Sequence, residues 1–184
     1  MDTLYEIDFE IIADRYPGSL SLADLTLPDS PLVAVNASFL AMTEYRDHEV
    51  IGRNCRFLSG SERSEEAGRL IKESIASRRP MAICLNNQKR SGECFNNLLF
   101  LSYIKTRDGG DYAIGAQNEI LEQSWESDTE RAICRTQDIT RELAHKTATS
   151  EIARNCFELR GIAALVRSQI TARRAARFMR YQTA

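Results

Sequence analysis

Residues 81–121, MAICLNNQKRSGECFNNLLFLSYIKTRDGGDYAIGAQNEIL, decide the fold, because they hold three β-prone stretches separated by two turn signals. The turn signals are Arg90-Ser91-Gly92 and Asp108-Gly109-Gly110, and each is short enough to join neighbouring antiparallel strands. The pattern therefore predicts an antiparallel meander, with strands over residues 81–89, 93–105 and 111–121.

The sequence before this meander predicts two more strands and several short helices. Extended stretches over residues 20–26 and 32–35 flank a Pro-Asp-Ser-Pro turn, which is typical of a hairpin. Asn36, Asp47 and Ser61 each precede helical sequence and are predicted to cap three helices. The order of elements indicates an α+β fold, in which short helices cover one face of a five-stranded antiparallel sheet.

Helical segments are predicted at both ends, outside a central domain of residues 19–121. Residues 1–18 are expected to form an amphipathic N-terminal cap, since one helix face carries Tyr5, Phe9, Ile12 and Tyr16. Residues 122–184 are expected to form a C-terminal extension whose narrow apolar stripe consists of Ile152, Cys156, Leu159, Ala163, Val166 and Ile170. The stripe indicates either a seam between two copies of the chain or a helix packed on its own sheet.

Composition limits the class of protein. The chain has 184 residues, of which 43% are hydrophobic and 27% charged, so it can build a core and is neither fibrous nor wholly disordered. Neither a signal peptide nor a membrane-spanning apolar run is recognisable. The five cysteines form no C-x-x-C pair, which favours free thiols in a reducing cytoplasm.

Charge is distributed unevenly along the chain. All 26 acidic residues precede residue 159, whereas residues 159–184 carry six arginines and no acid. An acidic body is therefore followed by a basic C-terminal end.

The heptapeptide Gly52-Arg53-Asn54-Cys55-Arg56-Phe57-Leu58 resembles the signature of LOV (light, oxygen, voltage) domains, the blue-light-sensing members of the PAS superfamily. The resemblance extends from about residue 20 to residue 120, through LPDSP, NASFLAMTEY, Asn87, Asn97 and the IGAQ that ends in Gln117. It implies the PAS/LOV fold and a short LOV protein without an effector domain, which would be a sensor and not an enzyme.

The resemblance also implies a cofactor and a set of site residues. The cofactor is flavin mononucleotide (FMN), held noncovalently in the dark, and Cys55 is the residue whose thiol reversibly joins ring carbon C4a after illumination. Asn87, Asn97 and Gln117 would bind the pyrimidine edge of the ring, and Arg56 and Lys72 the phosphate. In sequence order, the cofactor-binding residues expected are Asn54, Arg56, Leu58, Ser59, Lys72, Ile75, Asn87, Asn97, Leu99, Leu101, Gly115 and Gln117.

The sequence departs from the family pattern at Ala23, Ser59, Leu99 and Ala113, and we expect these changes to tune the lifetime of the light-induced state. The signal is expected to leave through Gln117 and the last strand. It would alter the packing of the terminal helices, and with it dimerisation or the binding of a downstream protein.

Three alternatives remain open from the residues. His145 and the helices around it are weakly similar to a phosphotransfer helix, and the arginine-rich end could contact nucleic acid or a membrane, although neither partner is expected. Cys55, flanked by arginines, could instead be a redox-active thiolate with His48 as its base. No histidine and cysteine spacing indicates a metal site.

Overall fold

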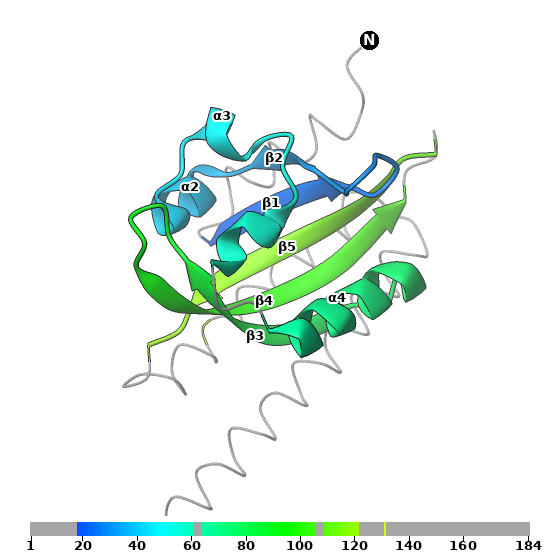
Figure 1. Cartoon of the computed structure of the whole chain (residues 1–184). Coiled ribbons are helices and arrows are strands. Elements are labelled where there is room, and N and C mark those ends of the chain that lie inside the picture. Colours follow the sequence, from blue (N-terminus) through cyan, green and yellow to red (C-terminus); the bar gives the residue numbers. More distant parts are fainter. Residues whose placement is uncertain (1–17, 61–63, 106–108, 122–130, 132–184) are drawn as a thin grey trace, which may run out of the picture.

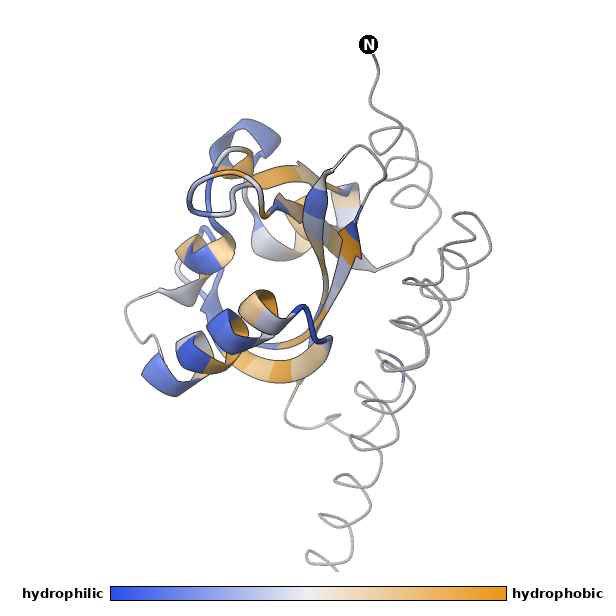
Figure 2. Cartoon of the chain, turned by 90° about the vertical axis from the view of Figure 1, so that its right-hand side faces the viewer, coloured by the Kyte–Doolittle hydropathy of each residue, from blue (hydrophilic) through white to orange (hydrophobic). Residues whose placement is uncertain are grey.

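The computed structural model describes residues 18–60, 64–105, 109–121 and 131. They form a five-stranded antiparallel sheet of order β2-β1-β5-β4-β3, and its helices gather on one side of the curved sheet (Figures 1 and 2). The strands are β1 (Ser19–Asp24), β2 (Leu32–Val35), β3 (Met81–Gln88), β4 (Cys94–Lys105) and β5 (Asp111–Glu119). The predicted α+β architecture is confirmed, and the strands of the meander end within two residues of their predicted bounds.

The helical elements between β2 and β3 are short. They are α2 (Ala37–Thr43), α3 (Asp47–Val50), the 3₁₀ helix η1 (Cys55–Ser59) and α4 (Glu65–Ser77). Asn36 caps α2, as predicted. Two predicted caps are wrong: Arg46 and not Asp47 precedes α3, and Ser64 and not Ser61 caps α4 by accepting from the Ala67 amide.

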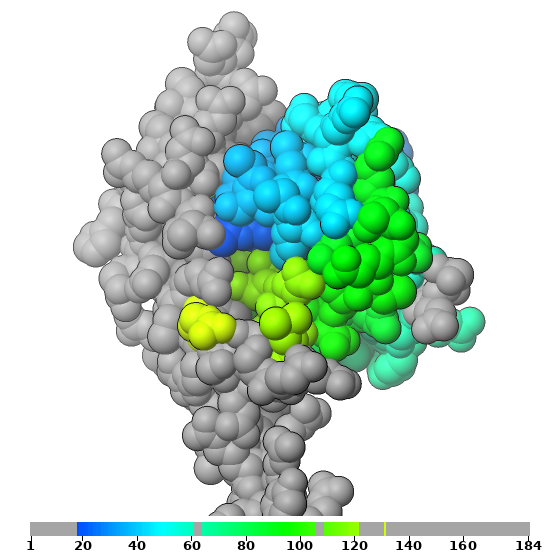
Figure 3. Space-filling model, turned by 90° about the vertical axis from the view of Figure 1, so that its left-hand side faces the viewer, coloured from blue at the N-terminus to red at the C-terminus, as the bar shows by residue number. Residues whose placement is uncertain are grey.

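The register of the sheet places alternate residues of its inner strands on the helix side. In β4 and β5, Leu99 pairs with Gln117, and Leu101 pairs with Gly115. In β1, Ser19 pairs with Gln117, and Ser21 pairs with Gly115. Because side chains alternate with a period of two, these residues share one face of the sheet. The start of β1 and the end of β5 lie side by side, as the blue and yellow-green surfaces in Figure 3 show.

Two apolar clusters hold the helices against the sheet. The first joins β2, α2, α3 and η1, through buried Leu32, Phe39, Val50 and Leu58. The second joins α4 to the sheet, where Leu101, Tyr103 and Ala113 pack against Ile71 and Ile75, among others.

Polar contacts fix the C-terminal end of α4. The hydroxyls of Ser74 and Tyr103 lie 2.6 Å apart, and Arg78 forms an ion pair with Asp111 at 2.6 Å. Helix α4 is therefore fixed over the C-terminal end of β4 and the N-terminal end of β5.

The predicted N-terminal cap and C-terminal extension lie outside the described residues, and the division of the chain at residues 18 and 122 stays a prediction. Within the part of the chain that the structure describes, no helix is long and apolar enough to cross a membrane.

Asn36 connects α2 with β1. Its side-chain oxygen accepts from the amides of Leu20 (2.9 Å) and Phe39 (3.0 Å), and its amide donates to the carbonyl of Gly18 (2.7 Å). All three bonds are buried, so a lost partner would not be replaced by water.

We predict that Asn36→Ala lowers the free energy of unfolding by about 2 kcal/mol or more, because it removes a helix cap and leaves a buried strand amide unpaired. Asn36→Ser is the matched control, since a serine hydroxyl at this position can still cap α2 by accepting from the Phe39 amide. Urea unfolding of both variants measures the difference, and equal losses would contradict this account.

Candidate functional site

A cavity of about 270 Å³ lies between the sheet and the helices η1 and α4. Its volume is close to the lower end of the range typical of small-molecule sites. Cys55 and all the predicted cofactor-binding residues line it: Asn54, Arg56, Leu58, Ser59, Lys72, Ile75, Asn87, Asn97, Leu99, Leu101, Gly115 and Gln117. The fold thus brings the whole predicted set together, while the role of each residue in binding stays a prediction.

Several lining residues were not predicted. Ser21, Leu25 and Leu32 come from the first two strands or the loop between them, and Ile71 and Leu85 come from α4 and β3. Ser21 had a recognisable signal, because it lies two residues before Ala23 in a predicted strand and so shares its face. His48, the base considered for a redox-active thiol, is not among the lining residues.

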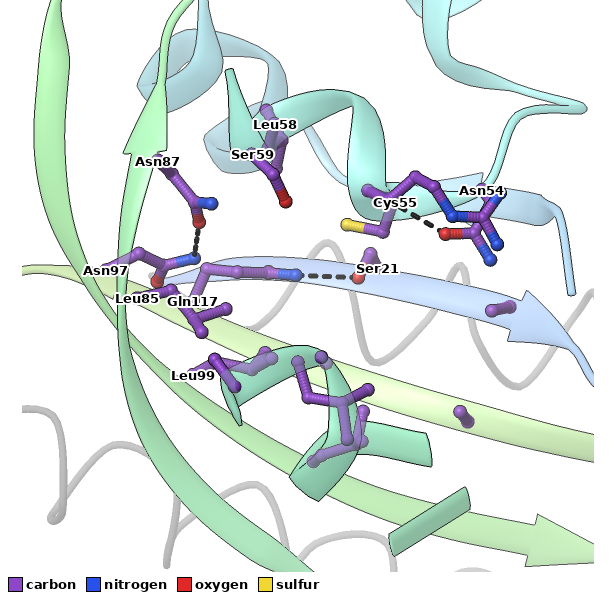
Figure 4. A pocket seen from close by; sticks show the side chains of 18 of the residues that line it. Ser21, Asn54, Cys55, Leu58, Ser59, Leu85, Asn87, Asn97, Leu99 and Gln117 are labelled. Carbon is purple, nitrogen blue, oxygen red and sulfur yellow. Dashed lines mark hydrogen bonds between the residues drawn. The ribbon is translucent and has the colours of Figure 1, made fainter. Parts of the chain in front are cut away.

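Cys55 is the first residue of η1, and the residue before it sets its position. Asn54 accepts a hydrogen bond from the Arg56 amide at 3.0 Å and donates to the carbonyl of Asp29 at 2.5 Å. The cap therefore ties η1 to the turn between β1 and β2. Figure 4 shows the Cys55 sulfur directed into the cavity, toward the side that carries Asn87, Asn97 and Gln117.

The Cys55 thiol is chemically a neutral group. Burial raises its pKa to about 12, because desolvation penalises the thiolate. At neutral pH the sulfur therefore keeps its proton, which disfavours the alternative of a redox-active thiolate. A neutral thiol in an apolar wall can react when a suitable electrophile is held against it.

Three buried amides form the polar wall opposite η1. Asn97 donates to the Asn87 oxygen at 2.9 Å and accepts from the backbone amide of Asn118 at 3.2 Å. Gln117 contacts the hydroxyls of both Ser19 and Ser21, at 3.2 and 2.8 Å. Figure 4 shows the contact with Ser21. Amides both donate and accept, so this wall matches a planar heterocycle with alternating carbonyl and N–H groups.

The mouth of the cavity carries two cations with different surroundings. The Arg56 guanidinium makes two hydrogen bonds to the Asp29 carboxylate, at 2.6 and 2.5 Å, and the hydrogen bond lowers the pKa of Asp29. Lys72 makes no ion pair with another described residue. Arg56 is thus partly neutralised by its own chain, whereas Lys72 offers a point charge.

The donor set and the shape fit a flavin. The cavity has apolar walls from Leu58, Ile75, Leu99 and Leu101, a row of amides at one end and cations at the mouth. Gly115 keeps the floor open, because a Cβ there would lie 2.8 Å from the Gln117 amide nitrogen. The part of the chain that the structure describes holds no group of three potential metal ligands.

This architecture defines a PAS domain, and a family model described as "PAS domain" matches residues 21–122. The crystal structure of the Rhodobacter sphaeroides LOV protein superimposes with a TM-score of 0.76 at 32% identity, over 93% of this chain and 99% of that one. The chain belongs to the LOV family of PAS-domain proteins.

Two longer proteins are similar to part of the chain. Phototropin-1A of Oryza sativa subsp. japonica is 36% identical over 112 residues, which are 60% of this chain and 12% of that protein. A blue-light-activated histidine kinase of Brucella canis is 45% identical over 83 residues, which are 45% of this chain and 17% of the kinase. The chain thus spans less than a fifth of either relative.

We predict that Cys55 in the native protein reacts with iodoacetamide at pH 8 about a hundredfold more slowly than the exposed Cys94, because its raised pKa leaves little thiolate. Peptide mass spectrometry of samples quenched over time measures both rates, and denatured protein, in which the two should react alike, is the control. Equal native rates would revive the thiolate alternative.

Proposed function

We propose that the protein is a blue-light photoreceptor that binds FMN noncovalently in the dark and senses light through Cys55. The observation that carries this proposal is the Cys55 sulfur directed into a cavity that also carries a wall of three buried amides (Figure 4). Kinship with a kinase described as blue-light-activated supports the same function. A bound flavin would supply absorption of blue light and an electrophilic ring carbon, C4a.

The chain's contribution to the reaction is proximity. With a flavin held in the cavity, Cys55 would be the residue that gives up its thiol proton, to ring nitrogen N5, as its sulfur bonds to C4a after illumination. In darkness the sulfur would release the ring and take back its proton, so the cycle would consume no oxidant or reductant. The cap formed by Asn54 holds the sulfur in place, and the apolar walls exclude water from the reacting atoms.

The remaining lining residues bind and orient the cofactor in this proposal. Asn87, Asn97 and Gln117 bind the pyrimidine edge by hydrogen bonds, while Arg56 and Lys72 attract the phosphate. The aliphatic side chains of the walls pack against the ring faces.

The output is a change in contacts and not catalysis by this chain. The Gln117 amide would respond to a proton on N5 by turning its oxygen toward the ring, because N5 would then donate and no longer accept, and this reversal would change the hydrogen bonding at the end of β5. The strand leads to residues 122–184, through which we propose a light-dependent change in homodimerisation or in binding to a downstream protein. Outputs by phosphotransfer at His145 or by binding of nucleic acid to the arginine-rich end concern residues outside the described part of the chain.

We predict that the flavin-loaded protein loses its blue absorption band on illumination and regains it in darkness, and that Cys55→Ala abolishes the bleaching while retaining the flavin. Absorption spectra of lit and dark samples measure both properties. Cys94→Ala is the matched control, because Cys94 is exposed and does not line the cavity. Reversible bleaching in Cys55→Ala would refute the assignment of the reactive sulfur.

We predict that Asp29→Asn raises the affinity for FMN about two- to fivefold while leaving the affinity for riboflavin, which lacks the phosphate, unchanged. The substitution removes the carboxylate that competes with a phosphate for Arg56, and exposed ion pairs of this kind contribute up to about 1 kcal/mol. Fluorescence titrations of the flavin-free protein measure both affinities. A parallel gain for riboflavin would show that the effect is not electrostatic.

A further inference from the structure

The side chain of Gln117 lies between two serines of the neighbouring strand. Ser19 is its partner across the β1–β5 ladder, and Ser21 lies opposite Gly115, two residues further along. All three polar side chains are buried. Ser21 lines the cavity and Ser19 does not, so the two ends of the Gln117 amide face different surroundings.

In one orientation, the amide directs its nitrogen to the cavity side. The nitrogen donates to the Ser21 hydroxyl at 2.8 Å, and the oxygen accepts from the Ser19 hydroxyl at 3.2 Å. The end that holds the oxygen also lies 3.2 Å from the Ser19 carbonyl and 3.1 Å from the Gly115 carbonyl, which are both acceptors. Among the described residues, the Ser19 hydroxyl is therefore the donor that offsets two unfavourable oxygen–oxygen contacts.

In the reversed orientation, the same positions are satisfied without conflict. The nitrogen now faces the Ser19 hydroxyl and both carbonyls, at 3.1 to 3.2 Å, and the oxygen accepts from the Ser21 hydroxyl at 2.8 Å. A hydroxyl both donates and accepts, so Ser21 serves either orientation equally. The Ser19 hydroxyl does not serve both orientations equally. The carbonyls of Ser19 and Gly115 can replace it as partners only when the Gln117 nitrogen faces them, because carbonyls accept and do not donate.

We infer that Ser19 is a positioning residue that stabilises the dark orientation of Gln117 against a scaffold that favours the reversed one. The inference rests on the proposed function, in which N5 accepts a hydrogen bond in the dark and donates one after the thiol has added. The dark state needs the amide nitrogen on the cavity side. In that orientation the amide oxygen, at the other end, depends on the Ser19 hydroxyl as its donor. The lit state needs the oxygen on the cavity side, which the backbone carbonyls support unaided.

Gly115 supplies the space that this arrangement needs. A Cβ at this position would lie 2.8 Å from the Gln117 nitrogen and 2.9 Å from the Ser21 hydroxyl, both closer than carbon atoms normally approach. Because Ser19 is the first residue of β1, reversal of the amide changes hydrogen bonds on β1 as well as on β5. The light signal then reaches the strand that follows residues 1–18 as well as the strand that precedes residues 122–184.

The experiment compares Ser19→Ala with the wild-type chain after flavin loading. Loss of the hydroxyl destabilises the dark orientation more than the reversed one, in which two backbone carbonyls still accept from the nitrogen. Dark recovery after a light pulse should therefore slow about two- to tenfold, the effect of one neutral hydrogen bond. The light-minus-dark infrared difference spectrum should also lose much of the Gln117 carbonyl signal, identified by its absence in Gln117→Leu, because the amide is already reversed in the dark.

Rescue and control variants separate positioning from general damage. Ser19→Thr retains the hydroxyl and should restore both readouts. Ser19→Cys replaces the hydroxyl by a thiol, a weak donor, and should also slow recovery and weaken the carbonyl signal. It takes the place of the alanine variant if that variant folds poorly. Ser102→Ala, on β4 and outside the cavity lining, should match the wild type.

Wild-type recovery and a full carbonyl signal in Ser19→Ala and Ser19→Cys would overturn the role of Ser19 while leaving the photoreceptor function intact. A wild-type protein that binds flavin but does not bleach would instead remove the proposed function, and this inference with it. The wild-type spectrum distinguishes these two failures before any variant is measured.

Discussion

The constraint on which the structure depends is that buried amides in an apolar interior must keep hydrogen-bond partners, since each unpaired group costs about 1–3 kcal/mol. The helix side of the sheet meets this constraint within the chain. Asn87 and Asn97 bond to each other, and Gln117 lies between two serine hydroxyls. The same amides retain donor and acceptor capacity toward the cavity, so the groups that stabilise the fold also define the site.

The helix side of the cavity supplies an uncharged sulfur, that of Cys55. Cys55 starts a short 3₁₀ helix that Asn54 fastens to the turn before β2, and burial keeps the thiol protonated. The described residues that line the cavity include no histidine or carboxylate that could act as a general base for the sulfur. The fold therefore contributes by holding the sulfur in place and by excluding water from it. A reaction started by light fits such a site better than acid–base catalysis does.

Local sequence predicted the strands well and the helix starts less well. Turn residues at 90–92 and 108–110 are strong signals, and β3, β4 and β5 followed them within two residues. Two caps were misplaced. For α4, Ser61 and Ser64 both precede acidic sequence, so local sequence does not decide between them. Arg46 precedes α3 because Glu49 bonds back to its amide at 2.9 Å, a contact that also places Asp47 inside the helix.

The sequence by itself determined the family, and through the resemblance to LOV domains it predicted Cys55 as the reactive residue and Asn87, Asn97 and Gln117 as the amides of the site, because the cysteine lies in a continuous motif and the amides lie at the family's positions in the sequence. Tertiary structure alone decided that Arg56 pairs with Asp29 and that Ser19 and Ser21 flank Gln117. Ser19 and Gln117 are 98 residues apart, and their contact depends on the register between the first and last strands of the sheet. Local propensity cannot set that register, because it results from burying both strands against the rest of the domain.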